Sequence, residues 1–433
     1  MTSALMPDKN GLFFKFAGFH SFLMGLLPFY IPVLLWQQGY ALWQLSFFIA
    51  LTGLGFLLTL PLWKNLYWNN QWNKIIRTSF ILETLLFTTV LFIEALPLTA
   101  SLSLVALLNG AYLCFYWTSQ RTLFTQLENE QENGTATGNN FGNFQIVVMV
   151  LLKVGILLSA FLLEQGFGIV LLTLSIIVAL IGLLYLPTQV QTENIARLNS
   201  NNHDIALDKP TRAVFYVDGL FLYLESYFWL LSLYLIAQQD IMQLGFIVVG
   251  LTLLLAGLFW LIKGRIDATP ANTIFQLAII GYVISWLLRG FIGLGSETGA
   301  DLTSASEEIN YPIILLIAFL TSFFRLSFNK RFFDHASIIK TNLLKANSSD
   351  SNQAQMIQYL LDKSTLSQMG ILVFFSALGI ALFSTSTSTL LSIPMNINSQ
   401  LSWIYMAVAP LVLLYSFYSQ PLENTQGRPS CIR

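Results

Sequence analysis

Charged residues are scarce in this chain of 433 residues, at 10% of the total. In soluble domains about a quarter of the residues are charged, so a soluble globular protein is excluded. Cysteine is nearly absent, with only Cys114 and Cys431, so neither a disulfide framework nor a cysteine metal site can form. A net charge of −1 provides no basic surface for nucleic acid, and no glycine-rich loop with lysine is present to hold a nucleotide phosphate. We expect no cofactor, no bound metal and no nucleic-acid partner.

Hydrophobic residues, by contrast, make up 55% of the chain. A helix needs about 20 mainly apolar residues to cross the hydrocarbon core of a bilayer. Twelve stretches meet this requirement, which predicts an all-α membrane protein with twelve transmembrane helices. The predicted spans are 12–35, 45–63, 75–96, 99–120, 141–164, 168–187, 212–237, 243–263, 271–293, 311–329, 366–386 and 401–419.

Lysine and arginine outside these spans are confined to alternate connections and the two ends of the chain. The six opposite connections contain acidic residues but no lysine or arginine. Because basic residues are retained on the cytoplasmic side, both termini are predicted to be cytoplasmic. We expect a multi-pass protein of the plasma membrane, which is the inner membrane in a Gram-negative bacterium, acting as a monomer in the lipid bilayer.

The chain also contains traces of an internal duplication, with related residues about 200 positions apart. Gln37 corresponds to Gln238 at the ends of the first and seventh spans, and Lys64 corresponds to Lys263. The predicted organisation is an N-terminal six-helix bundle (1–187), a polar cytoplasmic linker (188–211), a C-terminal six-helix bundle (212–420) and a cytoplasmic tail (421–433).

Two parallel six-helix halves with both ends cytoplasmic resemble the major facilitator superfamily of secondary transporters. The segment 63–74 after the second span keeps the basic charge of the family's loop but lacks its aspartate. The corresponding segment of the second half, Lys263 to Asp267, is closer to that pattern but truncated. The resemblance implies alternating access to a central site lined by the first, fourth, seventh and tenth spans. A helix-breaking pair, Pro28 and Pro32, predicts a kink in the first span.

The seventh span carries the candidates for proton coupling. Asp218 and Glu225 are seven residues apart and share one helix face, while Tyr216, Tyr223 and Tyr227 lie on the opposite face. Burial near mid-membrane disfavours an ionised carboxylate, so Glu225 is a candidate for reversible protonation; a structural glutamate paired with a neighbouring helix is the alternative. Asp218 is a second candidate, or a gate residue. Which of the two faces lines the cavity stays open.

His20 in the first span is the third proton-coupling candidate, because imidazole titrates near neutral pH. It is predicted to exchange protons with Glu225, and a hydrogen-bonded helix contact is the alternative. Glu83 and Lys153, both within spans of the first half, are predicted to form a structural ion pair.

Polar residues on the fourth and tenth spans are candidates for binding the substrate. By the family resemblance these spans line the cavity, and the alternatives are polar groups in helix packing or, for Arg325, interaction with lipid headgroups. The candidates are Asn109, Tyr112, Tyr116, Gln120, Arg325 and Asn329.

The sequence therefore predicts a secondary active transporter of a small organic solute, such as a metabolite, a drug-like compound or a siderophore, with transport coupled to protons. Two alternatives belong to other classes. One is a membrane-embedded enzyme of lipid-linked substrates, although the predicted external connections contain no histidine or arginine. The other is a sensor or assembly factor that keeps a transporter fold without transporting.

Overall fold

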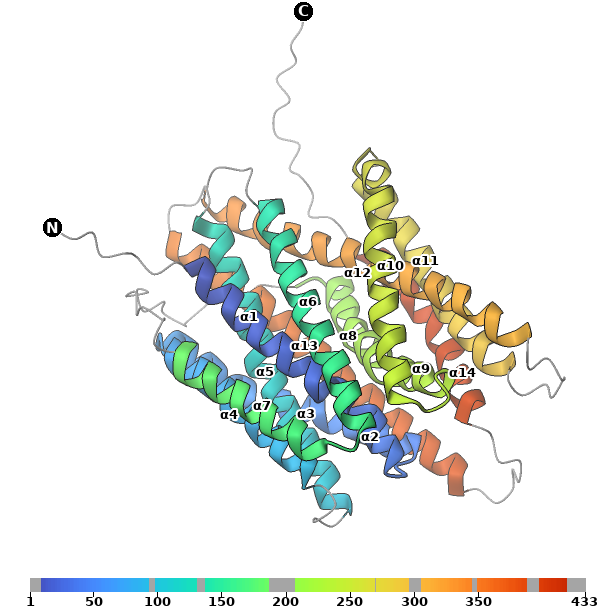
Figure 1. The fold of residues 1–433 in the computed structure, drawn as a ribbon. Coiled ribbons are helices and arrows are strands. Elements are labelled where there is room, and N and C mark those ends of the chain that lie inside the picture. Colours follow the sequence, from blue (N-terminus) through green and yellow to red (C-terminus); the bar gives the residue numbers. More distant parts are fainter. Residues whose placement is uncertain are drawn as a thin grey trace, which may run out of the picture. The chain divides into compact units, whose positions relative to one another are not determined.

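The structure is a computed structural model, which describes residues 9–92, 98–130, 137–186, 207–268, 270–295, 305–344, 349–387 and 397–418. Every regular element in these ranges is helical (Figure 1). Helices are the expected solution for long apolar segments, because the lipid core offers no hydrogen-bond partners to an open backbone. The predicted linker (188–211) and tail (421–433) lie largely or wholly outside the described residues.

The chain divides into two compact units. Unit 1 comprises Met1–Asn201, Asp218–Ala256 and Leu360–Ile397, and unit 2 comprises Asn202–Val217, Gly257–Tyr359 and Asn398–Arg433. The helices that lie wholly in unit 1 are α1 (Lys9–Leu26), η1 (Pro28–Tyr30), α2 (Ile31–Gln37), α3 (Leu42–Trp68), α4 (Trp72–Leu91), α5 (Leu98–Glu130), α6 (Thr137–Glu164), α7 (Gly168–Tyr185), η4 (Leu224–Trp229) and α9 (Leu230–Ile236).

Three long helices contribute residues to both units: α8 (Lys209–Tyr223), α10 (Ile241–Ala268) and α13 (Ser349–Thr387). Unit 2 also contains α11 (Ala271–Gly295), α12 (Ala305–Leu344), α14 (Ile397–Val408) and η5 (Ala409–Phe417). The division into two six-helix bundles predicted from the sequence is a separate matter and stays a prediction.

Ten helices in the described residues are long and apolar enough to cross a membrane, and a bent pair makes an eleventh candidate. The bent pair is the first predicted span, in which Phe13–Leu26 and Pro28–Gln37 meet at 41°. The predicted kink is thus confirmed, at Pro28. The one predicted span missing from these candidates is 75–96, which corresponds to α4. This helix of 20 residues contains three charged side chains, Lys74, Arg77 and Glu83, whereas each of the candidates has an apolar stretch of 18 residues with at most 2. The chain is an integral multi-pass membrane protein.

Glycines allow the closest helix contacts of unit 1. Gly55 of α3 and Gly110 of α5 face each other, and a Cβ at Gly110 would overlap the carbonyl oxygen of Thr52. Gly25 of α1 and Gly155 of α6 meet in the same way. Because small residues let two backbones approach, these pairs fix α3 against α5 and α1 against α6. The positions of α1, α4 and α5 then determine where their polar side chains meet.

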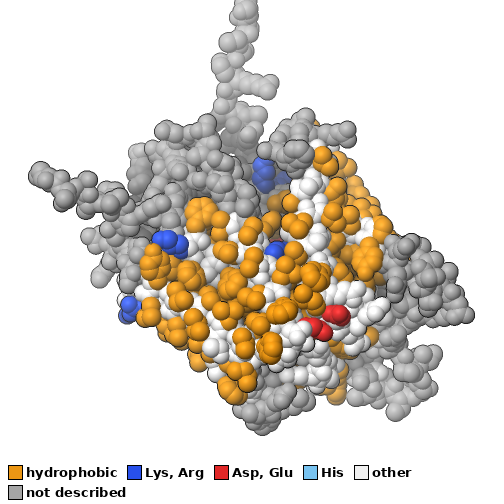
Figure 2. All heavy atoms as spheres, in the orientation of Figure 1, with side chains coloured by type: hydrophobic (Ala, Val, Ile, Leu, Met, Phe, Trp, Pro, Cys, Tyr) orange, Lys and Arg blue, Asp and Glu red, His pale blue; other side chains and the backbone are white. Residues whose placement is uncertain are grey.

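Aromatic side chains form the core of unit 2. The Tyr282 ring of α11 stacks on Phe324 of α12, with ring centroids 4.1 Å apart, and Tyr415 of η5 packs edge-on against Phe324 at 4.8 Å. Tyr359 and Tyr418 share a hydrogen bond of 2.8 Å between their hydroxyls. Many outward side chains are also apolar, as expected for lipid contact: the described part of the face drawn in Figure 2 is mainly hydrophobic, with few charged groups.

Candidate functional site

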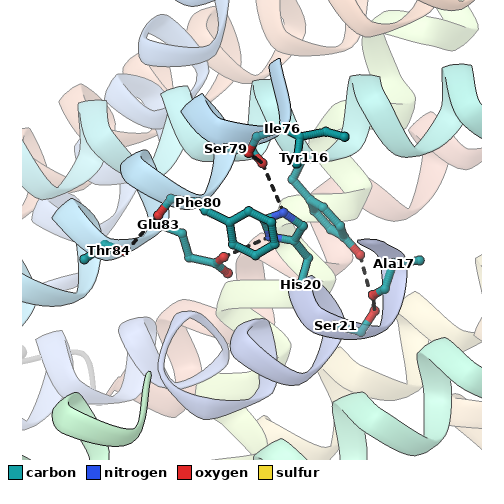
Figure 3. Close-up of polar contacts among 9 residues, drawn as sticks. All are labelled: Ala17, His20, Ser21, Ile76, Ser79, Phe80, Glu83, Thr84 and Tyr116. Carbon is teal, nitrogen blue, oxygen red and sulfur yellow. Dashed lines mark hydrogen bonds and ion pairs between the residues drawn. The ribbon is translucent and has the colours of Figure 1, made fainter. Parts of the chain in front are cut away.

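A buried histidine and glutamate form the centre of the candidate site (Figure 3). His20 of α1 places its Nδ1 2.8 Å from Glu83 Oε2 of α4, and both side chains are fully buried. The other ring nitrogen, Nε2, lies 3.1 Å from the hydroxyl of Ser79, one turn before Glu83 on α4. An ionisable group within a membrane span is costly unless it is paired, and each member of this pair offsets the cost of the other.

The hydrogen-bond directions assign one proton of the His20 ring. The Ser79 hydroxyl donates to the Ile76 carbonyl at 2.8 Å, so it accepts from His20, and Nε2 carries a hydrogen. The opposite ring nitrogen, Nδ1, faces the Glu83 carboxyl at 2.8 Å. The ring is therefore held between two groups of the same helix, α4.

Aromatic rings enclose the pair. Phe80 stacks on the His20 ring, with centroids 4.2 Å apart, and Phe16 packs edge-on at 4.6 Å. Gly182 of α7 makes room for Phe80, because a Cβ there would lie 2.5 Å from the Phe80 ring. In such surroundings the electrostatic interaction between His20 and Glu83 is stronger than in water.

The predicted substrate stripe of α5 is buried and faces other helices. Tyr112 interacts electrostatically with Glu83, and the Tyr116 hydroxyl lies 3.4 Å from that of Ser21 on α1 (Figure 3). Asn109 donates from Nδ2 to the Tyr227 hydroxyl at 3.0 Å. Gln120 is also buried. The stripe thus connects the His20–Glu83 pair with the seventh predicted span, and its role in solute binding stays a prediction.

The seventh predicted span contains a π-helical turn that changes its faces. The segment η4, Leu224–Trp229, is π-helical between α8 and α9. Such a turn adds a residue and rotates everything beyond it, so Asp218 and Ser232 do not share the continuous stripe that a regular helix would give. Tyr223 and Tyr227 are buried and stacked at 5.4 Å, and Glu225 within the turn is half-buried. Tyr216, by contrast, is exposed.

Asp218 belongs to a second charged cluster. It lies 3.3 Å from Lys363 Nζ of α13, and the Arg121 guanidinium of α5 donates to Ser364 at 3.0 Å. Lys363 precedes the predicted span 366–386 and so falls in a predicted cytoplasmic connection, whereas in the structure it lies within the candidate span Gln355–Thr385.

The remaining candidates are Lys153 and two residues of unit 2. Glu83 lies against His20, and this differs from the Glu83–Lys153 pair predicted from the sequence, because α4 packs on α5 and α7 whereas α6 packs on α1. In unit 2, Arg325 donates to the Tyr282 hydroxyl at 3.3 Å, and Asn329 is half-buried. Among the described residues no group of three histidine, cysteine or acidic side chains could hold a metal ion.

Comparison with known proteins identifies the fold. No family model matches the chain, and no curated protein matches it in sequence. Solved structures do: the nucleoside transporter NupG has a TM-score of 0.60 and 13% identity, over 95% of this chain and 98% of that one. The structure of a NupG mutant has a TM-score of 0.61 and 12% sequence identity, over 95% of this chain and 99% of that one. The chain therefore shares the fold of the transporter NupG, in agreement with the transporter fold predicted from the sequence.

Proposed function

We propose that this protein is a secondary active transporter of a small organic solute, driven by protons and working by alternating access. Two six-helix halves, joined by a cytoplasmic linker, would expose a mid-membrane site to each side of the plasma membrane in turn, and a monomer suffices. The support is a transporter fold over 95% of the chain together with a titratable pair, His20 and Glu83, buried within the membrane-spanning helices.

The His20–Glu83 pair carries the coupling part of the proposal. It is fully buried, so a proton reaches it only when α1, α4 or α5 moves. A pair without a proton between its members would hold a bare carboxylate in aromatic surroundings, which is costly. Protonation and helix movement are therefore linked in free energy, as proton-driven transport requires. Glu225 and Asp218 remain the other candidates for this role.

The solute side of the proposal rests on α5. Asn109, Tyr112, Tyr116 and Gln120 offer amides and hydroxyls without fixed charge, a set suited to a polar solute. Nucleosides are the first solutes to test, because NupG is a nucleoside transporter.

The test is solute uptake into proteoliposomes with an imposed pH gradient. Wild type should accumulate solute only with the gradient, whereas Glu83→Gln should abolish accumulation and keep solute counterflow, because glutamine mimics the protonated acid. Glu164→Gln, the same change at an exposed helix end, is the control and should transport normally. Undiminished gradient-driven uptake by Glu83→Gln would remove this residue from coupling. Absence of wild-type flux for metabolites, nucleosides and drug-like compounds alike would overturn the transport proposal.

A further inference from the structure

Lys153 is a charged residue of α6 for which the described part of the chain supplies no counter-ion. Once Glu83 is paired with His20, the expected partner of Lys153 is taken. The ion pairs found among the described residues join His20 to Glu83 and Lys363 to Asp218, and none of them includes Lys153. An unpaired ammonium within a membrane span opposes folding, and such residues face a wet cavity or bind a ligand.

The position of Lys153 along α6 places it inside the apolar part of the helix. The candidate membrane span of α6 is Val147–Glu164, so Lys153 stands six residues after its start and eleven before its end, about 9 Å and about 16 Å along the axis at 1.5 Å per residue. Both distances exceed the length of an extended lysine side chain. The ammonium therefore lies within the span rather than at its edge.

The helix geometry shows which way Lys153 points. Residues Lys153, Leu157 and Ala160 are spaced i, i+4 and i+7, so they lie on one stripe of α6. The part of this stripe formed by Leu157 and Ala160 faces α10. A Cβ at Gly245 of α10 would lie 3.0 Å from the Ala160 Cβ and 3.9 Å from Leu157 Cδ2. Lys153 continues the stripe toward the start of α6.

The other faces of α6 have different roles. Gly155 packs against the Phe22 carbonyl of α1, and the side formed by Val150, Val154 and Phe161 is about half exposed, as lipid-facing residues are. Lys153 itself is half-buried. It thus lies at neither the α1 contact nor the centre of the lipid face.

We propose that Lys153 binds an anionic group, a carboxylate or a phosphate, of the transported solute on the α6 face turned toward α10. This inference rests on the proposed transport function and adds a substrate class to it. An ammonium is a compact donor of three hydrogen bonds that suits a carboxylate or phosphate oxygen. The solute would supply the counter-charge that the described residues do not, so the ion pair is completed only in the loaded protein.

The test measures thermal stability of the purified full chain with and without anionic probes. Inorganic phosphate, uridine monophosphate and benzoate are compared with the neutral probes uridine and benzamide. At least one anionic probe should raise the Tm of wild type by several degrees, should do so less in Lys153→Arg, and should have no effect in Lys153→Met. Lys15→Met, which removes an exposed lysine of α1, is the control and should respond as wild type does.

A second measurement separates a binding lysine from a structural one. Without probe, Lys153→Met should be at least as stable as wild type, because it removes a desolvated charge, whereas a structural lysine would lose stability. Equal shifts in wild type and Lys153→Met, or no shift with any anion, would overturn the proposal. So would a Lys153-dependent shift seen only with phosphatidylglycerol vesicles, because the anion would then be a lipid headgroup.

The two proposals fail separately. If neutral solutes are transported and Lys153→Met changes neither their flux nor any anion response, transport stands and the anion site falls. If anions bind through Lys153 but no solute crosses the membrane, the site stands and transport falls.

Discussion

The interaction between His20 and Glu83 can be measured by removing each partner and then both. His20→Leu leaves the Glu83 carboxyl fully buried without its partner, and breaking a buried pair in this way costs about 3–5 kcal/mol. Glu83→Leu leaves an imidazole that can remain neutral, so the loss is the smaller cost of an unsatisfied polar atom, about 1–3 kcal/mol. The double variant contains two apolar side chains in an aromatic pocket.

The double variant should therefore lose much less stability than the two single variants together. We expect a coupling free energy of roughly 3 kcal/mol, at the upper end for residues in contact. Unfolding in detergent can be followed with a thiol-reactive dye, because Cys114 is buried in the folded protein; Cys431 is replaced by serine in all variants. Additivity within about 0.5 kcal/mol would refute the pairing.

Three further predictions concern helix contacts. Gly110→Ala should lower the free energy of unfolding by about 1–3 kcal/mol, because the new Cβ would meet the α3 backbone. The control Gly250→Ala, whose Cβ would have no atom within 4 Å, should raise that free energy by up to about 1 kcal/mol in the same assay. Asp218→Leu should lower the free energy of unfolding by about 3–5 kcal/mol, because it leaves the buried Lys363 ammonium without its carboxylate. The double variant Asp218→Lys with Lys363→Asp should restore most of the folded yield in size-exclusion chromatography. Tyr227→Phe should lower the free energy of unfolding by about 1 kcal/mol, because the Asn109 amide would lose the hydroxyl to which it donates. An unchanged Tm would contradict that hydrogen bond.

The membrane-spanning helices could be predicted from the sequence because long apolar runs have few alternatives in lipid. Each of the twelve predicted spans coincides with helical structure in the described residues, and the Pro28 kink follows from local chemistry. The predicted transporter fold agrees with the fold shared with NupG, while the internal duplication and the cytoplasmic termini stay predictions.

The partners of the charged residues could not be predicted in the same way. The pairing of Glu83 with His20 depends on how α4 packs against α1 and α5, which spacing along one helix does not encode. Lys363 was placed outside the membrane because the apolar run begins only at about residue 366, whereas α13 begins at Ser349. The π-helical turn at Leu224–Trp229 has no recognised signal in these residues, and the sequence pattern therefore predicts a regular helix with a seven-residue stripe.

The same π-helical turn has a mechanical consequence. A π-helix widens each turn by one residue, and rewinding Leu224–Trp229 as α-helix would rotate α9 against α8 by about 100°. A twist of that size would turn every side chain of α9 by one residue position around the helix axis relative to α8. Spin labels placed in α8 and α9 would detect this as a change in their mutual orientation upon adding solute, and identical spectra in both conditions would show that the turn is a fixed element.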